Sequence, residues 1–440
     1  MMRRCVAACL LALAAAAAQA QGSPAANTEA ALTLQAAEAR MFAGNRDIAL
    51  ARRVVDQARA DTAIAGQKPN PQLGVAVQNI NRNRGVGSGT LRDKTVDTIV
   101  GISQTIERGG KAELRVAAAQ SMVAAAQSDL RDIARTQLLA LRSAYHDLQA
   151  AQERRSGAEE TARLFARSVQ AAELRLKAGD LAAADVARIR VDAARAGNDV
   201  TAAAADEARA RLSLAVLMGA EAEPGLRATS PWPAAGESGA VAPDALERRP
   251  DVRAAAARVE AADRARELAQ SLRTRDVTVS AQFEHYPVSE ANSAGSGNSF
   301  GVGFAVPLFL RHSYEGEAAR AQADWYAARD AYDRTLALAK AEVARARGDV
   351  AAARERRVRI EDELLPQARK SAEAAEFAFR NGATGVMDLL DARRTLRAIQ
   401  IEASAARADH ARALAALRAG VEELPPDALT AAEGTSRKEQ

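Results

Sequence analysis

Short stretches of alternating apolar and polar residues stand out along the chain. From residue 72, Leu73, Val75 and Val77 alternate with polar or small neighbours, and the alternation resumes near residue 95 after a loop of turn-forming residues. A period of two places successive side chains on opposite faces of a strand. The pattern therefore predicts a β-hairpin with strands at about residues 72–81 and 95–104.

The same pattern recurs in the second half of the chain. Val277 and Val279 begin an alternating stretch, a loop rich in Gly, Ser and Asn follows, and a further alternating stretch ends at Pro307. These residues predict a second hairpin, with strands at about residues 277–286 and 299–307.

The pattern around the hairpins is helical. No proline occurs between Pro71 and Pro224, so Lys111–Lys177 is predicted to be one helix, on the order of 100 Å long at about 1.5 Å per residue. Helix breaks are possible at Ser156-Gly157 and, in the second half, at Leu365-Pro366. A returning helix has a coiled-coil-like seam of mostly small residues: Leu396, Ile399, Ala403, Ala406, His410, Ala413 and Leu417.

The chain is a tandem duplication. Asn45-Arg46-Asp47-Ile48 opens one half and Arg249-Pro250-Asp251-Val252 opens the other, and one offset separates their aspartates (251 − 47 = 204) and first strands (277 − 73 = 204). We therefore expect repeats at residues 42–220 and 247–420, joined by a linker rich in Pro and Gly at residues 221–246.

The first residues have the features of a secretory leader, with two arginines, an apolar run and the cleavage signature Ala18-Gln19-Ala20. We expect residues 1–20 to be a signal peptide, residues 21–41 an N-terminal segment and residues 421–440 a flexible tail. The leader contains both cysteines, Cys5 and Cys9, so the mature chain would have no disulfide and no thiolate ligand. Lipid anchoring at Cys9 is an alternative, although the apolar run follows that cysteine instead of preceding it.

Composition argues against a thick globular core and against catalysis. Aromatic residues make up 3% of the 440 residues, and abundant alanine is typical of long helices packed through small side chains. The formal net charge is +4 with acids and bases interleaved, so neither nucleic acid nor an acidic membrane surface is implied. We expect no enzyme activity and no cofactor, because the sequence suggests neither a catalytic Ser/His/Asp arrangement nor a phosphate loop. We expect no bound metal, because the four histidines lie far apart: His146, His285, His312 and His410.

Each predicted strand has about the length that crosses a bilayer when tilted, and each has one apolar face. No stretch after the leader approaches the roughly 20 uncharged apolar residues of a membrane helix. Four strands leave open edges that a membrane does not tolerate, and the smallest membrane barrels need about eight strands. Several copies would then pool their hairpins around an aqueous lumen. Soluble hairpins on a helical body are the alternative.

A G-x-x-x-x-x-D-x-L-D-A motif runs from Gly382 to Ala392, and Gly179 to Asp185 is a shorter echo of it in the first half. Together with the duplicated helix-hairpin-helix plan, the motif resembles the TolC family of outer membrane factors, over nearly the whole mature chain. These are the exit channels of tripartite efflux pumps and type I secretion systems. The resemblance implies a mostly α fold with membrane β-strands: a homotrimer with a twelve-stranded β-barrel and a periplasmic α-helical barrel.

The resemblance also implies a passive exit channel in the outer membrane of a Gram-negative bacterium. Its partners would be itself, outer membrane lipid, a periplasmic adaptor of the membrane fusion protein type and an inner-membrane RND-type pump. A soluble periplasmic coiled-coil adaptor or structural protein is the alternative, although an adaptor would be expected to have one helical hairpin flanked by β-rich domains. The sequence leaves open the cargo, the identity of the pump and adaptor, and the oligomer number apart from the resemblance.

Candidate gate residues lie in the two tip turns that the resemblance implies. Carboxylates repeated by symmetry at a constriction attract cations and repel one another, whereas solvated turn or cap residues are the alternative. In some family members an arginine holds the tip closed, and Thr384 aligns with that arginine. The sequence therefore does not indicate how this tip would be held closed. The candidates are Asp388, Asp391, Asp185, Thr384 and the nearby aromatic Phe379, with Gly179 and Gly382 in the turns.

The segment Ile106-Glu107-Arg108-Gly109-Gly110-Lys111 follows the second strand. It resembles the E-x-G-G-K signature common in family members of the heavy-metal resistance type, and two glycines suit a strand that turns into a helix. Alternatively, the segment is only a connection between strand and helix that gives no information about cargo. The protein would then be an exporter of drugs or of general solutes. The candidate joint residues are Glu107, Gly109, Gly110 and Lys111.

Overall fold

A computed structural model describes residues 31–80, 88–90, 96–221, 225–237, 245–288, 295–421 and 429. The predicted signal peptide, much of the N-terminal segment, parts of the linker and hairpin loops, and most of the C-terminal tail lie outside these residues. The chain divides into two compact units. The first contains Met1–Ile48, Ala134–Ala242 and Glu342–Gln440, and the second contains Ala49–Ile133 and Pro243–Ala341.

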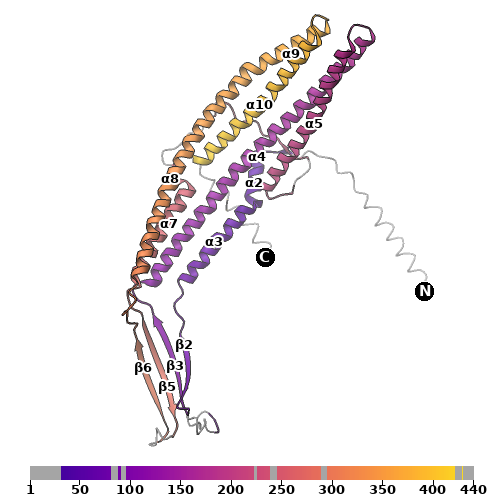
Figure 1. The fold of residues 1–440 in the computed structure, drawn as a ribbon. Helices are drawn as coiled ribbons and strands as arrows, with labels where there is room; N and C mark the ends of the chain where they lie inside the picture. The colour runs from indigo at the N-terminus through magenta and orange to yellow at the C-terminus, as the bar shows by residue number, and fades with distance from the viewer. Residues whose placement is uncertain are drawn as a thin grey trace, which may run out of the picture. The chain divides into compact units, whose positions relative to one another are not determined.

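The second unit contains a four-stranded antiparallel sheet with the order β2-β3-β5-β6 (Figure 1). The two predicted hairpins join through β3 and β5, from Thr98 opposite His285 to Ile106 opposite Val277. The strands are β2 (Gln72–Gln78), β3 (Asp97–Ile106), β5 (Val277–Tyr286) and β6 (Gly297–Ala305). The prediction for β5 matches, but β2 ends three residues early and β3 and β6 are each shifted by two, because alternation fixes faces more firmly than ends.

Directly opposed residues share a face of the sheet, so the register separates two chemically different faces. One face is mainly apolar, with Leu73, Val75, Val77, Val100, Ile102, Ile106, Val277, Val279, Ala281, Phe283, Phe300, Val302 and Phe304. The other face is mainly polar or small, although it also contains Ile99 and Tyr286. Its polar and small residues include Gln72, Gly74, Ala76, Gln78, Gly101, Ser103, Thr278, Ser280, Gln282, Glu284, Ser299, Gly301 and Gly303.

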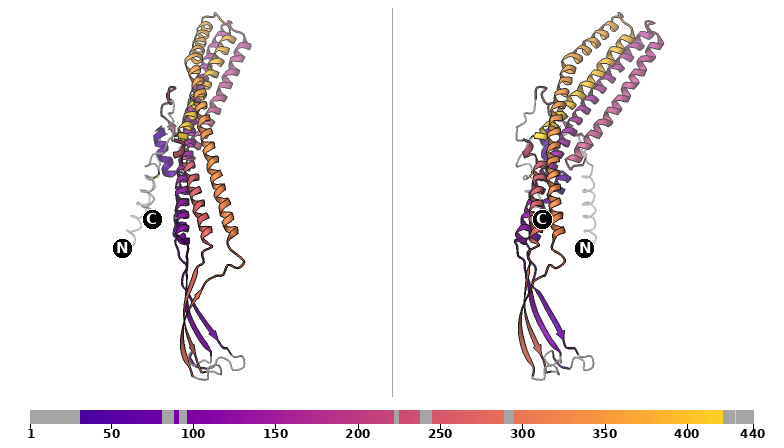
Figure 2. Two further views of the ribbon diagram at one scale, coloured as in Figure 1. Left: turned by 90° about the vertical axis from the view of Figure 1, so that its left-hand side faces the viewer. Right: turned by 60° about the vertical axis from the view of Figure 1, so that its left-hand side comes forward.

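The helices of the second unit extend from one end of this sheet (Figures 1 and 2). α6 (Ala245–Arg248) and α7 (Pro250–Ser271) lie within this unit, whereas α3 (Arg46–Ala65), α4 (Lys111–Lys177) and α8 (Glu315–Val358) continue into the first. Both predicted repeat openings begin a helix. Asn45 caps α3, where its side-chain oxygen accepts from the N–H groups of Asp47 (3.0 Å) and Ile48 (3.1 Å). Pro250 is the first residue of α7, where its missing N–H costs no hydrogen bond.

The first unit consists of two long helical hairpins, α4–α5 and α9–α10, which lie side by side in all views (Figures 1 and 2). A two-residue parallel pair, β1 (Ala31–Leu32) with β4 (Arg227–Ala228), ties the N-terminal segment to the linker. The remaining elements are α2 (Leu34–Gly44), α5 (Ala183–Leu217), the π-helix η1 (Arg359–Leu364), α9 (Leu365–Arg380) and α10 (Val386–Val421).

One predicted helix break is wrong and the other is confirmed. α4 continues without interruption through Ser156-Gly157, because an isolated glycine costs a helix only about 1 kcal/mol, which packing overrides. At Leu365-Pro366 the α-helical pattern gives way to η1, since proline lacks an N–H and clashes with the preceding turn. No helix in the described ranges is apolar over enough residues to cross a membrane.

Candidate functional site

Both hairpins of the first unit turn through the same backbone motif. After α4, Gly179 has a φ of +83°, its N–H donates to the Leu176 carbonyl (3.1 Å), and the Asp180 N–H donates to the Arg175 carbonyl (2.9 Å). The same two bonds recur around Gly382 (φ +72°) after α9, at 3.1 and 2.8 Å. This is the Schellman motif, in which the left-handed residue is normally glycine. Both predicted turn glycines are therefore required by the backbone.

The helices that follow these turns begin at equivalent positions (386 − 183 = 203). Asp185 and Asp388 are consequently counterparts in the first turns of α5 and α10, where the helix dipole favours negative charge. Asp185 is half-buried and pairs with Arg188 (3.4 Å). Asp388 and Asp391 are exposed, and neither has an ion pair or hydrogen bond within the described part of the chain.

Phe379 is a packing residue in the single chain. It is 5% exposed, and the guanidinium of Arg175 lies 5.1 Å from its ring centroid. Thr384 lies in the turn with its hydroxyl buried, and that oxygen has no hydrogen-bond partner among the described residues. In this chain the ring makes a core contact between the hairpins, because burial of an aromatic ring is strongly favourable. The buried cluster contains Phe165, Ala172, Val186, Ile189, Ala196, Phe379, Val386, Leu389 and Leu390.

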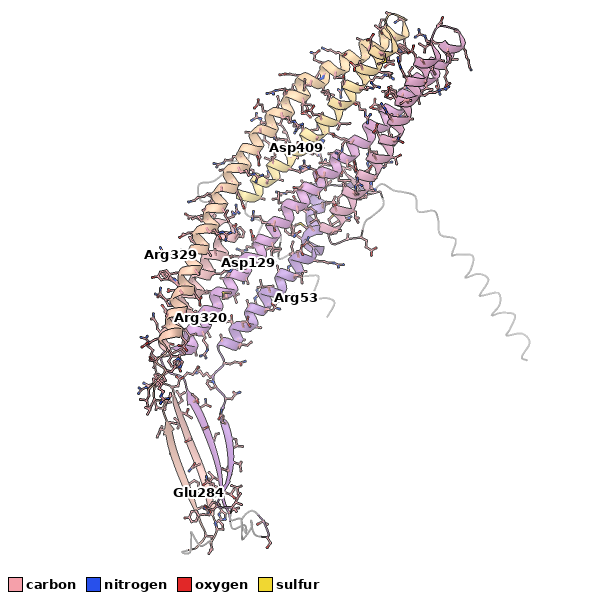
Figure 3. All side chains as sticks on the ribbon, in the orientation of Figure 1. Arg53, Asp129, Glu284, Arg320, Arg329 and Asp409 are labelled. Atoms are coloured by element: carbon pink, nitrogen blue, oxygen red, sulfur yellow. The ribbon has the colours of Figure 1, made fainter. Side chains whose placement is uncertain are left out.

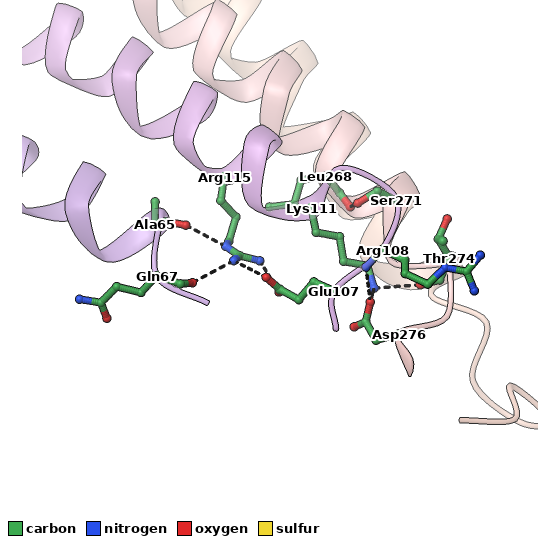
Figure 4. A network of polar contacts seen from close by, with 10 residues as sticks. All are labelled: Ala65, Gln67, Glu107, Arg108, Lys111, Arg115, Leu268, Ser271, Thr274 and Asp276. Atoms are coloured by element: carbon green, nitrogen blue, oxygen red, sulfur yellow. Dashed lines mark hydrogen bonds and ion pairs between the residues drawn. The ribbon is translucent and has the colours of Figure 1, made fainter. Parts of the chain in front are cut away.

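The predicted strand-to-helix joint in the second unit is built around an ion pair (Figure 4). Lys111 begins α4 and is 6% exposed; its ammonium donates to Asp276 Oδ1 and to the Thr274 carbonyl, both at 2.8 Å. The Arg108 N–H donates to the same Asp276 oxygen at 3.0 Å. Since Asp276 directly precedes β5, these bonds fasten the start of α4 to the second hairpin.

Glu107 fastens the other side of the joint. Two guanidinium nitrogens of Arg115 donate to its carboxylate oxygens, at 2.7 and 2.8 Å, in the bidentate geometry that arginine favours. The same guanidinium donates to the carbonyls of Ala65 (3.2 Å) and Gln67 (3.4 Å), at the end of α3 (Figure 4). One arginine therefore connects α3, β3 and α4.

The acids of this joint are held in their charged form. The hydrogen bonds from Arg115 are the main reason that the pKa of Glu107 lies below its usual value. Burial alone raises the pKa of Asp276, but the hydrogen bonds from Lys111 and the Arg108 N–H outweigh it, and the pKa lies below its usual value.

The two glycines of the joint have left-handed backbones. Gly109 has a φ of +80°, and a Cβ added there would lie 2.9 Å from the Thr274 side chain. Gly110 has a φ of +70°, but a Cβ there would meet only the Glu113 carboxylate at 4.0 Å. All four candidate joint residues thus have a structural role, and the geometry of the E-x-G-G-K stretch gives no information about cargo.

The polar face of the sheet has an acidic character near the hairpin loops. Glu284, labelled near the loop end of the strands in Figure 3, lies on this face and accepts a hydrogen bond from the Ser299 hydroxyl (3.1 Å). Asp97 lies on the same face and accepts from the Asn79 side chain. Among the described strand residues on this face, Asp97 and Glu284 are the only charged side chains. Asp97 is only 6% exposed, so Glu284 contributes most of the negative potential with which this face attracts cations.

Sequence reasoning missed a polar network in the first unit that holds the linker against the helices. Glu361, in η1, accepts from Arg357 (3.0 Å) and from Arg407, which also donates to Glu153 (3.0 Å). Glu153 accepts from the indole N–H of Trp232 in the linker (2.6 Å). The only sequence signal was Leu365-Pro366, which marked η1 but not its partners.

His410 lies buried beside this network. Its Nδ1 lies 3.3 Å from a guanidinium nitrogen of Arg357, which also donates to the Pro233 carbonyl (2.7 Å). Burial, followed by the charge of Arg357, lowers the pKa of His410 below its usual value. The imidazole is therefore neutral at pH 7, and it does not meet another histidine in a metal-binding group among the described residues.

The duplicated long helical hairpins and the amphipathic β-sheet are the features of a channel subunit that combines membrane β-strands with long helices. Comparison with known families agrees: the model of the family described as "Outer membrane efflux protein" matches residues 38–220 and 241–421, and the chain belongs to this family. It is therefore an exit channel of the outer membrane, as the sequence predicted. The soluble adaptor alternative is set aside.

Individual relatives are similar over most of their length. The chain is 28% identical over 376 residues to the cobalt-zinc-cadmium resistance protein CzcC of Cupriavidus metallidurans, covering 83% of this chain and 84% of that protein. The fold resembles the outer-membrane channel OprN (TM-score 0.73, 24% identity, 89% of this chain and 90% of that one). It also resembles CusC (TM-score 0.74, 18% identity, 88% and 91%).

Proposed function

We propose that three copies of this chain form one channel that conducts heavy-metal cations across the outer membrane. The main support for this proposal is the sheet, which has a mainly apolar face, a mainly polar face and two edge strands. Among the described residues β2 and β6 each pair with only one strand. In hydrocarbon an open strand edge costs several kcal/mol for each unsatisfied backbone group, so the edges have to pair with those of further copies.

Pairing β6 of one copy with β2 of the next closes the barrel. Three copies supply twelve strands, with Phe300, Val302 and Leu73 facing lipid and Gln72, Ser280 and Gln282 facing the lumen. The small residues of the polar face, among them Gly74, Gly101, Gly301 and Gly303, leave the lumen wide. In this proposal the four strands of the sheet cross the membrane, and the long helices of the chain form the periplasmic duct.

The tip turns of the first unit form the inner gate in this proposal. Asp388 and Asp391 are exposed on the first turns of α10, and threefold symmetry would bring six carboxylates around the axis. Asp185, the counterpart of Asp388 in the other repeat, already has Arg188 as a partner and contributes less negative potential. Asp388 and Asp391 have no ion-pair partner among the described residues, so their carboxylates would repel one another and hold the tip open. Binding of a cation or a partner protein would neutralise this repulsion.

Cation cargo is supported by two independent observations. The relative CzcC is by its name a cobalt-zinc-cadmium resistance protein. The charged residues on the described polar face of the sheet, Asp97 and Glu284, are both acidic and would favour cations at the outer end of the duct. A passive channel draws the energy for export from its partners, and the proposed partners are an RND-type pump in the inner membrane and a periplasmic adaptor.

Reversal potentials across planar bilayers that contain the purified full-length protein test this function. With a salt gradient of ZnCl₂ or KCl, we expect a cation-over-anion permeability ratio of roughly five or more, because the lumen potential is negative. The double variant Asp97→Asn, Glu284→Gln should lower that ratio severalfold without loss of conductance. A control variant, Asp61→Asn on the exposed surface of α3, should leave the ratio unchanged. An anion-selective or non-conducting protein would contradict the proposal.

A further inference from the structure

The two repeats differ in length where a strand passes into a long helix. β3 ends at Ile106 and α4 begins at Lys111, whereas β6 ends at Ala305 and α8 begins only at Glu315. The second connection, residues 306–314, is therefore the longer one, and its sequence is Val-Pro-Leu-Phe-Leu-Arg-His-Ser-Tyr. Figure 2 shows it as a coil between β6 and α8. We call these residues the anchor segment.

The anchor segment has an ordered conformation. The Phe309 ring packs edge-on against Tyr314, with centroids 5.2 Å apart, and the Arg275 guanidinium lies 5.4 Å from the Phe309 centroid. The His312 ring lies 4.5 Å from Tyr314. A hydrogen bond from the Leu310 N–H to the Leu308 carbonyl (3.0 Å) bends the chain tightly around Phe309. Phe309 is thus turned inward by specific contacts.

The same bend leaves the leucines on either side of Phe309 in solvent. Leu308 is 68% exposed and Leu310 is 84% exposed. Val306 precedes them, and its position continues the alternation of Val302 and Phe304 on the apolar face of the sheet. The anchor segment therefore extends the apolar face of the sheet to the helical end of the strands.

Exposed arginines lie in and near the anchor segment: Arg311 follows Leu310, and Arg275 contacts Phe309. Arg108, Arg273, Arg275 and Arg311 are all exposed at the ends of the strands. The nearby acids have other partners, because Glu107 pairs with Arg115, Asp276 with Lys111, and Glu317 with His312. Glu113 and Glu315 lie in the first turns of α4 and α8, where the helix dipole partly compensates their charge. The surface thus combines apolar side chains with basic ones.

We propose that the anchor segment binds phospholipid in the leaflet on the helical side of the membrane, with Leu308 and Leu310 among the acyl chains and Arg275 and Arg311 on lipid phosphates. This combination of inserted apolar side chains with flanking basic ones is how proteins bind a lipid interface. The inference rests on the proposed membrane position of the strands. The segment would fix the height of the barrel in the bilayer.

Site-specific fluorescence tests the proposal with the full-length protein. The only cysteines of the sequence are Cys5 and Cys9 in the predicted leader, so a single introduced cysteine can be labelled cleanly in the processed protein. We would label Leu310→Cys with an environment-sensitive dye in vesicles of phosphatidylethanolamine and phosphatidylglycerol. Quenching by lipids with a shallow or a deep doxyl group, and by aqueous iodide, is then measured. Val302→Cys on the lipid face of β6 and Arg320→Cys on α8, whose side chain is 86% exposed, are the controls.

The inference predicts shallow doxyl quenching at position 310 at least threefold above that at position 320, with deep quenching at position 302. Doxyl quenching at position 302 together with iodide quenching at position 310 would contradict lipid binding by the anchor segment, whereas the proposed membrane position of the strands would stand. No doxyl quenching at 302 would instead contradict the proposed function. Protection of 310 from both quenchers would mean that a second copy covers the segment, which also overturns the inference.

The arginines are tested in the same assay. Adding Arg275→Gln and Arg311→Gln to the labelled variant should lower the shallow quenching at position 310 at least twofold. The matched control changes Arg320 and Arg329, two exposed arginines of α8, to Gln and should leave it unchanged. Equal quenching in both backgrounds would contradict binding of lipid phosphate by Arg275 and Arg311.

Discussion

Gly110 and Tyr314 occupy the same position in the two repeats, directly before the helices that leave the sheet, and both have a left-handed backbone (φ +70° and +60°). Each carbonyl accepts the first bond of its helix, from Leu114 (3.0 Å) and Ala318 (3.2 Å). Glycine adopts this conformation without cost, whereas a tyrosine pays about 1–2 kcal/mol. The ring contacts of Tyr314 with Phe309 and His312 offset that strain.

Two variants at Tyr314 separate strain from ring contacts. Tyr314→Ala keeps the left-handed strain and loses both ring contacts, whereas Tyr314→Gly loses the contacts but relieves the strain. We expect the glycine variant to be more stable than the alanine variant by about 1 kcal/mol in chemical denaturation. Equal stability of the two would show that the backbone at this position is not strained.

The neighbouring glycines of the first joint should differ in their tolerance of a side chain. Gly110→Ala has only the left-handed conformation to oppose it and should cost about 1 kcal/mol. Gly109→Ala adds a clash with Thr274 and should cost roughly 2–3 kcal/mol in total. Gly316→Ala, in the open first turn of α8, is the control and should be neutral or slightly stabilising. The melting temperatures of the three variants in detergent rank their stabilities. A Gly109→Ala variant as stable as the Gly316→Ala control would contradict the close approach of Gly109 to the Thr274 side chain.

Acid should destabilise the first unit from about the ordinary histidine pKa downward. Burial and the charge of Arg357 lower the pKa of His410 in the fold, so the unfolded chain binds the proton first, and stability is lost as pH falls below about 6.5, the usual pKa of histidine. Burial also lowers the pKa of His146 in the same unit, so His410→Gln should reduce, without abolishing, the fall in melting temperature between pH 7 and pH 5. His312→Gln, which removes an exposed histidine, should retain the wild-type slope. An unchanged slope in the His410 variant would mean that another group titrates.

Neutralising the exposed tip carboxylates should change gating more than stability. We expect Asp388→Asn with Asp391→Asn to reduce block of the current by millimolar divalent cations at least threefold, since six charges leave the proposed constriction. Their exposure and lack of partners in the described chain predict a stability change within about 0.5 kcal/mol. Glu373→Gln, an exposed acid on α9, is the matched control. Unaltered block would remove these aspartates from the gate.

The sequence was sufficient where one local pattern decides the outcome. Alternation predicted β5 completely, and the glycines at positions 179 and 382 marked both Schellman turns. Contacts between distant segments could not be predicted, as the Lys111–Asp276 ion pair shows, because it forms only after β3 and β5 have paired. The burial of Phe379 could not be predicted for the same reason, since it depends on the other hairpin.

The central claim is that several copies of this chain close one barrel in the outer membrane. The most direct test is fractionation of cells expressing the full-length chain, followed by semi-native electrophoresis and native mass spectrometry of the detergent-extracted envelope. Our account predicts a heat-dissociable particle of three mature chains in the outer-membrane fraction. A monomer confined to the soluble periplasm would contradict it.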